Sequence, residues 1–198
     1  MGGVNGRAVA ILGAGGHGRD VAAIAEACGH EVLFYDDSPS TCLPSASGSL
    51  ARHQPYVVGV NDPATRRRLA VGSEPIGLVH PTATVAPSAR LGAGVVIGAG
   101  SHIGPDTVLG DHVHVGAGCT ITRTHVGDFT TISPGVDIAG DVIVGVECLI
   151  GVGTTVLNLV RIGHRCVIGA GSVVISHVGS DMTVAGVPAK PLQRREST

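Results

Sequence analysis

Residues 144–174 read VGVECLIGVGTTVLNLVRIGHRCVIGAGSVV, and an aliphatic side chain returns in this stretch at every sixth position. The same period runs from Val79 to Val174. A period of six is typical of repeat architectures, in which each short repeat buries its apolar side chain only by stacking on its neighbours. The anchor positions are Val79, Val85, Leu91, Ile97, Ile103, Leu109, Val115, Ile121, Val126, Ile132, Ile138, Val144, Ile150, Val156, Ile162, Ile168 and Val174.

Two other positions of each repeat are almost as regular as the anchor. A small or β-branched residue stands two positions before it, as at Cys148, Thr154 and Ser172, and glycine most often follows it, as at Gly145 and Gly151. One large and one small inward side chain per face fit a narrow coil. We expect the glycine to let the backbone turn with a positive φ. The pattern predicts a parallel β-helix and disfavours a β-sandwich; a solenoid with a purely structural role stays open.

The first part of the chain has the pattern of a nucleotide-binding unit. Residues 8–12 are a continuous apolar run suited to a buried parallel strand, GAGGHG follows over 13–18, and helical spacing extends from Arg19 to Cys28. A second strand is expected over 31–35, and Asp36-Asp37 end it. Glycine lets the backbone approach a ligand, N–H groups at a helix start hold a diphosphate, and an acidic strand end accepts hydrogen bonds from a ribose or a base.

A glycine-rich turn alone is a weak signal, because many strand-to-helix turns need glycine only for packing. His17 occupies a variable place of the dinucleotide fingerprint and the unit is short, which favours a nucleotide-sugar over NAD. A third strand is expected over 56–60 and a short helix over 64–71. We interpret Arg66-Arg67-Arg68 as a solvated helix face, with phosphate contact as the less favoured alternative. The coil is expected to begin near residue 76.

Composition indicates a compact soluble protein. The chain of 198 residues carries a formal net charge of −2 and has no Trp, but abundant Val, Ile and Leu can form a core. No apolar run approaches the roughly 20 residues that cross a bilayer, so we expect a cytoplasmic protein without membrane insertion or a nucleic-acid partner. Cys119, Cys148 and Cys166 occupy the small interior position of the repeat and are predicted to be reduced packing residues, not disulfides or metal ligands.

The motifs together resemble one family. They are ILGAGGHG over 11–18, the acidic pair at 36–37, the helix with Arg66, His80-Pro81, the coil, and AGVPAK over 185–190. Over nearly its whole length the chain is similar to the bacterial nucleotide-sugar acetyltransferases grouped as sialic acid O-acetyltransferase-like proteins. The resemblance implies an α/β Rossmann-like nucleotide-sugar-binding domain over 1–75, followed by a left-handed parallel β-helix acyltransferase domain with a C-terminal tail over 76–198. It also implies a homotrimer, with acetyl-CoA lying along the coil between neighbouring subunits.

The resemblance also implies roles for individual residues. Those expected to contact the UDP- or GDP-sugar are Gly15, Gly16, His17, Asp36, Asp37 and Asn61. Those expected to contact acetyl-CoA are Thr131, Val152 and Ala170, and the tail at 188–190 caps its groove. No metal is expected.

The repeat ITRTHVGDF over 121–129 departs from the family pattern. In the family a catalytic histidine stands two residues after the anchor of this repeat. The interval from Ile121 to Val126 is five residues here, so one residue is missing, and Thr122 or Arg123 takes the place of the histidine. A second family histidine, near the thioester, corresponds to Thr131.

Three explanations of this departure stay open. A deletion in a tight coil bulges the backbone, so His125 can reach the same cleft as the base, with Thr122 beside it and Asp128 orienting it. The substrate or another histidine can supply the base while the enzyme relies on proximity and electrostatic stabilisation. Finally, the protein can have kept the scaffold and lost the reaction.

Two histidines on one segment, His112 and His114, are interpreted as outward-facing and solvated. A metal is less favoured because no third ligand is spaced with them. The sequence as a whole predicts an acyltransferase that moves an acetyl group from acetyl-CoA to an amino or hydroxyl group of a nucleotide-activated sugar, by direct attack on the thioester. The alternative is a nucleotide-sugar-binding trimer without catalysis that has a scaffold or regulatory role.

Overall fold

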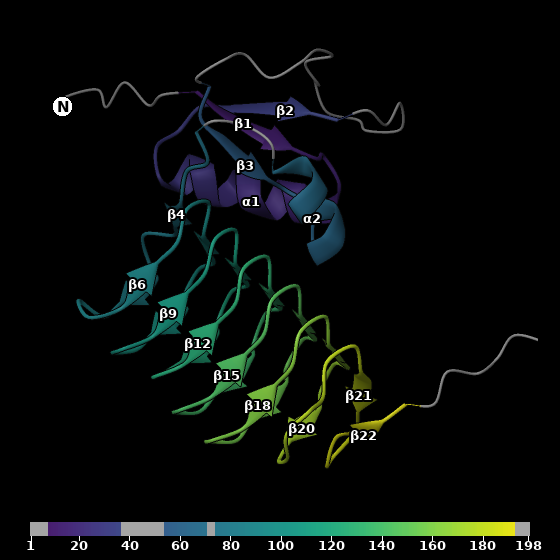
Figure 1. The fold of residues 1–198 in the computed structure, drawn as a ribbon. Coiled ribbons are helices and arrows are strands. Elements are labelled where there is room, and N and C mark those ends of the chain that lie inside the picture. Colours follow the sequence, from purple (N-terminus) through teal and green to yellow (C-terminus); the bar gives the residue numbers. More distant parts are fainter. Residues whose placement is uncertain (1–7, 37–53, 71–73, 193–198) are drawn as a thin grey trace, which may run out of the picture.

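The computed structural model describes residues 8–36, 54–70 and 74–192, which form a small α/β domain and a long stack of coils that extends from it (Figure 1). The α/β domain has a parallel sheet of strand order β2-β1-β3. No helix in the described ranges is both long and apolar enough to cross a membrane. The elements of the domain are β1 (Val9–Leu12), α1 (Gly16–Ala27), β2 (Val32–Tyr35), β3 (Tyr56–Val58) and α2 (Pro63–Leu69).

Close backbone contacts shape the glycine loop between β1 and α1. A Cβ on Gly18 would lie 2.0 Å from the carbonyl oxygen of Gly13, and one on Gly59 would lie 2.7 Å from the Cα of Gly18. Gly13 also has a φ of 105°, which a side chain would strain. Helix α1 begins at Gly16 and not at the predicted Arg19, because glycines carry no hydrophobic pattern that would show the first turn.

The rest of the described chain winds into the predicted parallel β-helix, so the fold class is confirmed. Its three faces are sheet B (β22-β21-β19-β16-β13-β10-β7-β4), sheet C (β20-β17-β14-β11-β8-β5) and sheet D (β18-β15-β12-β9-β6). The strands are β4 (Leu78–Val79), β5 (Thr84–Val85), β6 (Arg90–Leu91), β7 (Val96–Ile97), β8 (His102–Ile103), β9 (Val108–Leu109), β10 (His114–Val115), β11 (Thr120–Ile121), β12 (His125–Val126), β13 (Thr131–Ile132), β14 (Asp137–Ile138), β15 (Ile143–Val144), β16 (Leu149–Ile150), β17 (Thr155–Val156), β18 (Arg161–Ile162), β19 (Val167–Ile168), β20 (Val173–Val174), β21 (Thr183–Ala185) and β22 (Lys190–Pro191).

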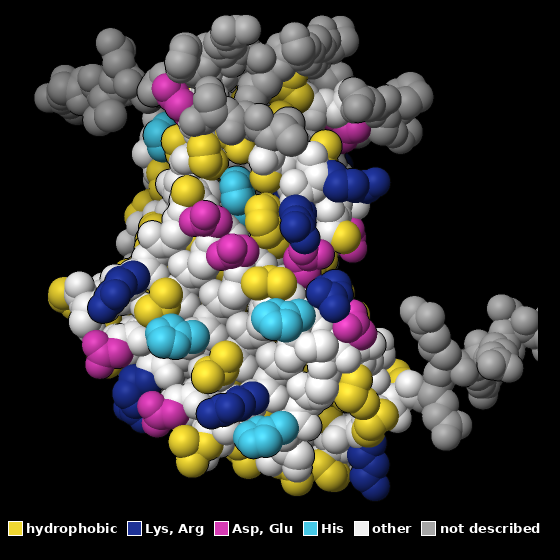
Figure 2. Space-filling model, viewed as in Figure 1, with side chains coloured by type: hydrophobic (Ala, Val, Ile, Leu, Met, Phe, Trp, Pro, Cys, Tyr) yellow, Lys and Arg dark blue, Asp and Glu magenta, His cyan; other side chains and the backbone are white. Residues whose placement is uncertain are grey.

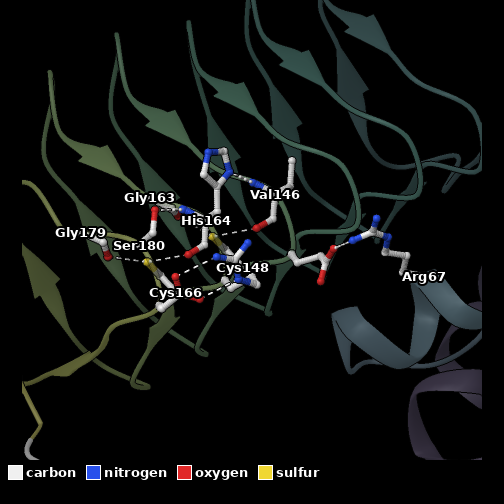
Figure 3. A network of polar contacts seen from close by, with 11 residues as sticks. Arg67, Val146, Cys148, Gly163, His164, Cys166, Gly179 and Ser180 are labelled. Carbon is white, nitrogen blue, oxygen red and sulfur yellow. Dashed lines mark hydrogen bonds and ion pairs between the residues drawn. The ribbon is translucent and has the colours of Figure 1, made fainter.

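The predicted anchors fill the inside of the coil. Those from Ile97 to Val174 are at most 3% exposed, whereas Leu91, near the start of the coil, is 38% exposed. The small interior positions are also buried as predicted. The thiol of Cys148 donates to the carbonyl of Gly163 at 3.0 Å, and the interior thiols are free rather than paired (Figure 3). Each thiol therefore satisfies its own hydrogen bond within the coil.

Glycine after the anchor has a different role from the one predicted. Gly145 and Gly169 do not have positive φ; the left-handed residue stands two positions later, at Glu147 (φ 56°) and Gly171 (φ 65°). A Cβ on Gly145 would instead lie 2.7 Å from the carbonyl carbon of Gly163 in the next coil. Glycine is needed after the anchor because adjacent coils approach closely there, and the turn itself accepts other residues.

The five-residue interval between Ile121 and Val126 is absorbed at one corner of the coil. Strand β12 keeps its parallel register with β9 and β15. Thr124 takes the small interior position, and the turn is reduced to Arg123, which has a φ of 45°. The predicted backbone bulge is wrong, because shortening the turn by one residue leaves the strand that follows, with His125, in its ladder.

The α/β domain packs against the first coils of sheet B. Leu78 and Val96 share a buried cluster with Val9, Ile11 and Val21. In addition, the exposed Arg67 of α2 forms an ion pair with Glu147 of the coil (Figure 3). Sheet B therefore forms one wall of the junction between the two parts.

Two isoleucines on consecutive strands, the inward Ile150 of β16 and the outward Ile143 of β15, allow a direct test of the coil. Ile150→Ala removes a fully buried side chain, and we expect it to lower the free energy of unfolding by about 2–5 kcal/mol. Ile143→Ala changes a side chain that is 44% exposed, and we expect a smaller loss, within about 1 kcal/mol. Urea denaturation followed by circular dichroism measures both, and equal losses would contradict the assignment of the inner face.

Candidate active site

A cavity of about 360 Å³ lies at the junction, between α1 and sheet B. This volume is in the range of small-molecule sites. Apolar side chains dominate its wall, and a few polar groups converge on it. The lining residues are His17, Asp20, Val21, Ala23, Ile24, Asn61, His80, Val96, Gly98, Ala99, His114, Val115, Gly116, Ala117, Thr131, Ile132, Ser133 and Pro134.

The glycine loop leads to the cavity through the first turn of α1. A Cβ added to Gly15 or Gly16 would meet nothing within 4 Å, so packing does not require glycine at these two positions. The space is open to a ligand that approaches the backbone N–H groups at the helix start. The carboxylate of Asp36 accepts a hydrogen bond from the backbone N–H of Ala14 at 2.6 Å, which holds the acidic strand end against the loop.

Arg66 joins the two parts of the protein at this site. Its side chain is 0% exposed and donates to the carbonyl of Val60 at 2.9 Å, to the carbonyl of Phe129 at 2.6 Å and to Oγ1 of Thr131 at 2.8 Å. Oγ1 of Thr131 in turn donates to the carbonyl of Asn61 at 2.8 Å. Burial lowers the pKa of Arg66 to about 10, so the side chain stays charged at neutral pH.

Two histidines meet between α1 and β10. Nε2 of His17 lies 2.8 Å from Nδ1 of His114, and the ring centroids are 5.1 Å apart. Burial, followed by the charge of Arg66, lowers the pKa of His17 to about 4, against the opposing effect of Asp20. Burial, then Arg66, His17 and His112, hold the pKa of His114 well below its ordinary value. Both rings are neutral at pH 7. One of the two facing nitrogens therefore carries a proton, and it donates that proton in a hydrogen bond to the other.

The burial of three side chains corrects the sequence-based prediction. Arg66, His112 and His114 are expected to be solvated, yet they are 0%, 7% and 1% exposed. The reason is that the α/β domain covers this part of sheet B, which the repeat pattern does not show. His112 stacks on Phe129, with ring centroids 5.1 Å apart. No group of three or more potential metal ligands occurs in the described part of the chain.

One edge of the coil leads away from the cavity. Ala99, Ala117 and Pro134, which border the cavity, stand above one another at the turn between sheets B and C, and Val152 and Ala170 continue this row in the next two coils. We call the row the B/C corner. In each coil the residue that follows the corner residue donates its backbone N–H to the carbonyl of the corner residue in the preceding coil, as Gly118 does to Ala99; these distances are 2.8–3.0 Å. The B/C corner is thus one apolar edge that connects the cavity to the predicted acetyl-CoA residues.

Three family models match separate parts of this architecture. The PglD N-terminal domain matches residues 8–71. The bacterial transferase hexapeptide (six repeats) matches residues 88–123, and the hexapeptide repeat of succinyl-transferase matches residues 141–176. A comparison with curated proteins finds no match.

Solved structures match the chain from end to end. The acetyltransferase domain of PglB from Neisseria gonorrhoeae, in complex with acetyl coenzyme A, is 35% identical, with 95% of this chain and 100% of that chain covered and a TM-score of 0.88. PerB from Caulobacter crescentus, in complex with CoA and GDP-perosamine, is 31% identical, with 96% of this chain and 98% of that chain covered and a TM-score of 0.88. This chain belongs to the family of bacterial nucleotide-sugar acetyltransferases. The family predicted from the sequence motifs is therefore confirmed.

In this member of the acetyltransferase family, the structure brings together only some of the predicted site residues. His17, Asn61 and Thr131 line the cavity, and Gly15 and Gly16 lie open beside it. Val152 and Ala170 stand further along the B/C corner, and Asp36 lies against the loop. Asp37 lies outside the described residues.

The three residues predicted for catalysis do not line the cavity of this acetyltransferase. His125 is exposed on sheet D, the face that Figure 2 presents, over which histidine, basic and acidic side chains are spread. Thr122 stands at the turn that precedes β12, and the carboxylate of Asp128 accepts a hydrogen bond from the backbone N–H of Asp111 at 2.9 Å. Within one chain the structure does not bring them to the predicted substrate residues.

Sequence reasoning missed two groups of the site, His114 and Arg66. A signal for His114 was available, because the outward positions in register with it in the two preceding coils, Val96 and Leu78, are apolar. Apolar side chains on the outer face indicate that something covers the sheet there. No comparable signal distinguishes Arg66 from Arg67 and Arg68, which are exposed.

The bonds of Arg66 predict a large effect of its removal. Arg66→Met leaves the carbonyls of Val60 and Phe129 without their donor, and we expect the free energy of unfolding to fall by about 3 kcal/mol. Arg68→Met is the matched control on the same helix, with an expected change within about 0.5 kcal/mol. Urea denaturation compares the two variants. If Arg66→Met were as stable as the control, Arg66 would not be the tie between the domains.

Proposed function

We propose that the protein transfers the acetyl group of acetyl-CoA to the amino group of a nucleotide-activated sugar. The observation that carries this proposal is the cavity that lies between the first turn of α1, next to the open glycine loop, and the B/C corner. An acceptor held at the loop and a donor lying along the corner meet there. The end-to-end similarity to PglB with acetyl coenzyme A, and to PerB with CoA and GDP-perosamine, supports both substrate classes.

The acceptor occupies the loop end of the site. The diphosphate lies over Gly15 and Gly16, where backbone N–H groups and the positive end of the α1 dipole favour negative charge. Asp36, together with Asp37, contacts the nucleoside. The sugar extends past His17 and Asn61 into the cavity, whose apolar wall suits a deoxy sugar with an amino substituent.

The donor occupies the B/C corner. The acetyl end of acetyl-CoA reaches the cavity beside Thr131, and the pantetheine arm follows Val152 and Ala170. Val152 is 54% exposed, so an apolar arm that covers it gains hydrophobic contact. Successive strands of the coil are about 4.8 Å apart, and an extended arm therefore crosses several coils.

The chemistry is a direct transfer. The amine nitrogen attacks the thioester carbonyl carbon, an N–C bond forms, and the C–S bond breaks as CoA leaves as a thiolate. The amine loses a proton to a base, and the thiolate takes up a proton to leave as the thiol. Holding both substrates in one cavity lowers the barrier through proximity.

Residues at sheet D take part only through a neighbouring subunit. We propose the predicted homotrimer, working in the cytoplasm, in which β12 of one subunit and the turns before and after it, with Thr122, His125 and Asp128, face the B/C corner of the next. Large apolar side chains on the outside of the coil support an assembly that covers them, among them Leu159, 63% exposed, and Ile175, 51% exposed.

Thiol release from acetyl-CoA tests the proposal directly. The purified protein is mixed with acetyl-CoA and a panel of UDP-, GDP- and TDP-amino sugars, and the free thiol is detected with a colorimetric reagent. We expect turnover with at least one acceptor and none without an acceptor. Nucleotide-sugar binding without acetyl-CoA binding or turnover would contradict the proposal and favour a non-catalytic binding protein.

Two substitutions separate the two ends of the site, and each is the control for the other. Gly15→Val places a branched side chain in the diphosphate space, and we expect the KM for the nucleotide-sugar to rise about tenfold or more while that for acetyl-CoA stays unchanged. Ala170→Trp blocks the B/C corner, and we expect it to raise the KM for acetyl-CoA while the KM for the nucleotide-sugar stays unchanged. Steady-state kinetics with each substrate varied measures both. If either substitution raised the KM for the other substrate instead, the assignment of the two ends would be wrong.

A further inference from the structure

Two histidines from distant parts of the chain contact each other at the wall of the cavity. His17 lies on the first turn of α1 and His114 on β10, 97 residues later, and their facing nitrogens are 2.8 Å apart. Both residues border the cavity. A histidine pair in the space where a proton must leave an amine is a candidate for the proton acceptor.

The two outer nitrogens of the pair have different surroundings. Nε2 of His114 is buried and has no hydrogen-bond partner in the described part of the chain. Nδ1 of His17 likewise has no hydrogen-bond partner among the described residues. This atom is not buried, and the ring that carries it borders the cavity. The pair therefore offers one accessible nitrogen to a ligand and shields the other from water.

We propose that His17 is the general base of the acetyl transfer and that His114 is a positioning residue that holds His17 in its reactive tautomer. The inference rests on the proposed function and names the base of that reaction. When Nε2–H of His17 donates to Nδ1 of His114, the lone pair of His17 Nδ1 is directed away from the pair. Ala117 and Pro134 of the B/C corner border the same cavity, so the thioester comes within reach of the amine.

The proton balance of the step is complete. The amine nitrogen forms its bond to the carbonyl carbon, and its proton moves to Nδ1 of His17. His17 becomes an imidazolium whose second N–H still donates to His114. The C–S bond breaks, CoA leaves as a thiolate, and the proton on His17 passes to the thiolate or to water, which restores the neutral pair.

Charged and titratable groups around the pair set its pH dependence. Among the described residues, Asp20 on α1, Arg66 on α2 and His112 before β10 act on the pair, and His80 lines the same cavity. Without substrate, burial and Arg66 keep His17 neutral and ready to accept a proton. A bound diphosphate at the start of α1 adds negative charge and raises the proton affinity of His17 in the complex. We therefore expect kcat to fall as pH decreases through the pKa of His17 in that complex.

The decisive variant is His17→Gln. The amide nitrogen of Gln replaces Nε2 as the donor to His114, but Gln cannot accept the proton. We expect kcat to fall about 100-fold or more, with little change in the KM for the nucleotide-sugar, and the acid limb of the kcat profile to disappear. Calorimetric melting and nucleotide-sugar binding of the same variant show that it is folded.

A pair of substitutions at His114 tests the positioning role. His114→Asn keeps an acceptor, Oδ1, in place of Nδ1, whereas His114→Leu removes the acceptor. We expect the Asn variant to keep kcat within about threefold of the unsubstituted protein, and the Leu variant to lose about tenfold and to shift the acid limb. Equal kcat values and pH profiles for the two variants would overturn the role of His114.

The outcomes for the base are distinct from those for the function. If the unsubstituted protein turns over and His17→Gln keeps the same kcat and the same acid limb, the inference alone is overturned. Loss of turnover in His125→Ala would then identify His125 as the base. No turnover of the unsubstituted protein with any amino sugar overturns the proposed function and this inference together.

Discussion

The guanidinium of Arg66 ties the α/β domain to the coil. It donates to Val60 on one side and to Phe129 and Thr131 on the other. A buried charge is stable only where hydrogen bonds replace its water, so these bonds leave few alternative positions for α2. Because α1 belongs to the same small domain, this tie also sets the distance between α1 and sheet B. The cavity and the contact between His17 and His114 both depend on that distance.

The sequence predicts the coil well because its determinants are local. An anchor such as Ile150 and its small partner Cys148 lie within one repeat, and both are buried as expected. The local sequence pattern does not predict the role of a residue that contacts the next coil. Gly145 is needed for the close approach of Gly163, which no single repeat shows. The short turn at Arg123 likewise keeps β12 paired with β9 and β15. This pairing depends on three adjacent coils, so the sequence of one repeat does not show it.

The candidate site is only partly predictable for a related reason. Gly15, Gly16 and His17 follow from the strand, loop and helix order, and the structure leaves the two glycines open. Whether His114 faces water depends on which face of the coil the α/β domain covers, and this is a tertiary property. Arg66 shows the same limit, because three consecutive arginines look alike in the sequence while one of them is fully buried. The groups that distinguish this site are thus the buried polar ones.

We propose one cavity in which an anionic acceptor enters from the glycine loop, a thioester enters along the B/C corner, and a neutral histidine pair lies between them. The most direct test is a crystal structure of the protein with coenzyme A and a nucleotide amino sugar. We predict the diphosphate at the start of α1, coenzyme A beside Val152 and Ala170, and the sugar nitrogen about 3 Å from Nδ1 of His17. A sugar nitrogen bound against His125 of a neighbouring subunit, away from the cavity, would contradict it.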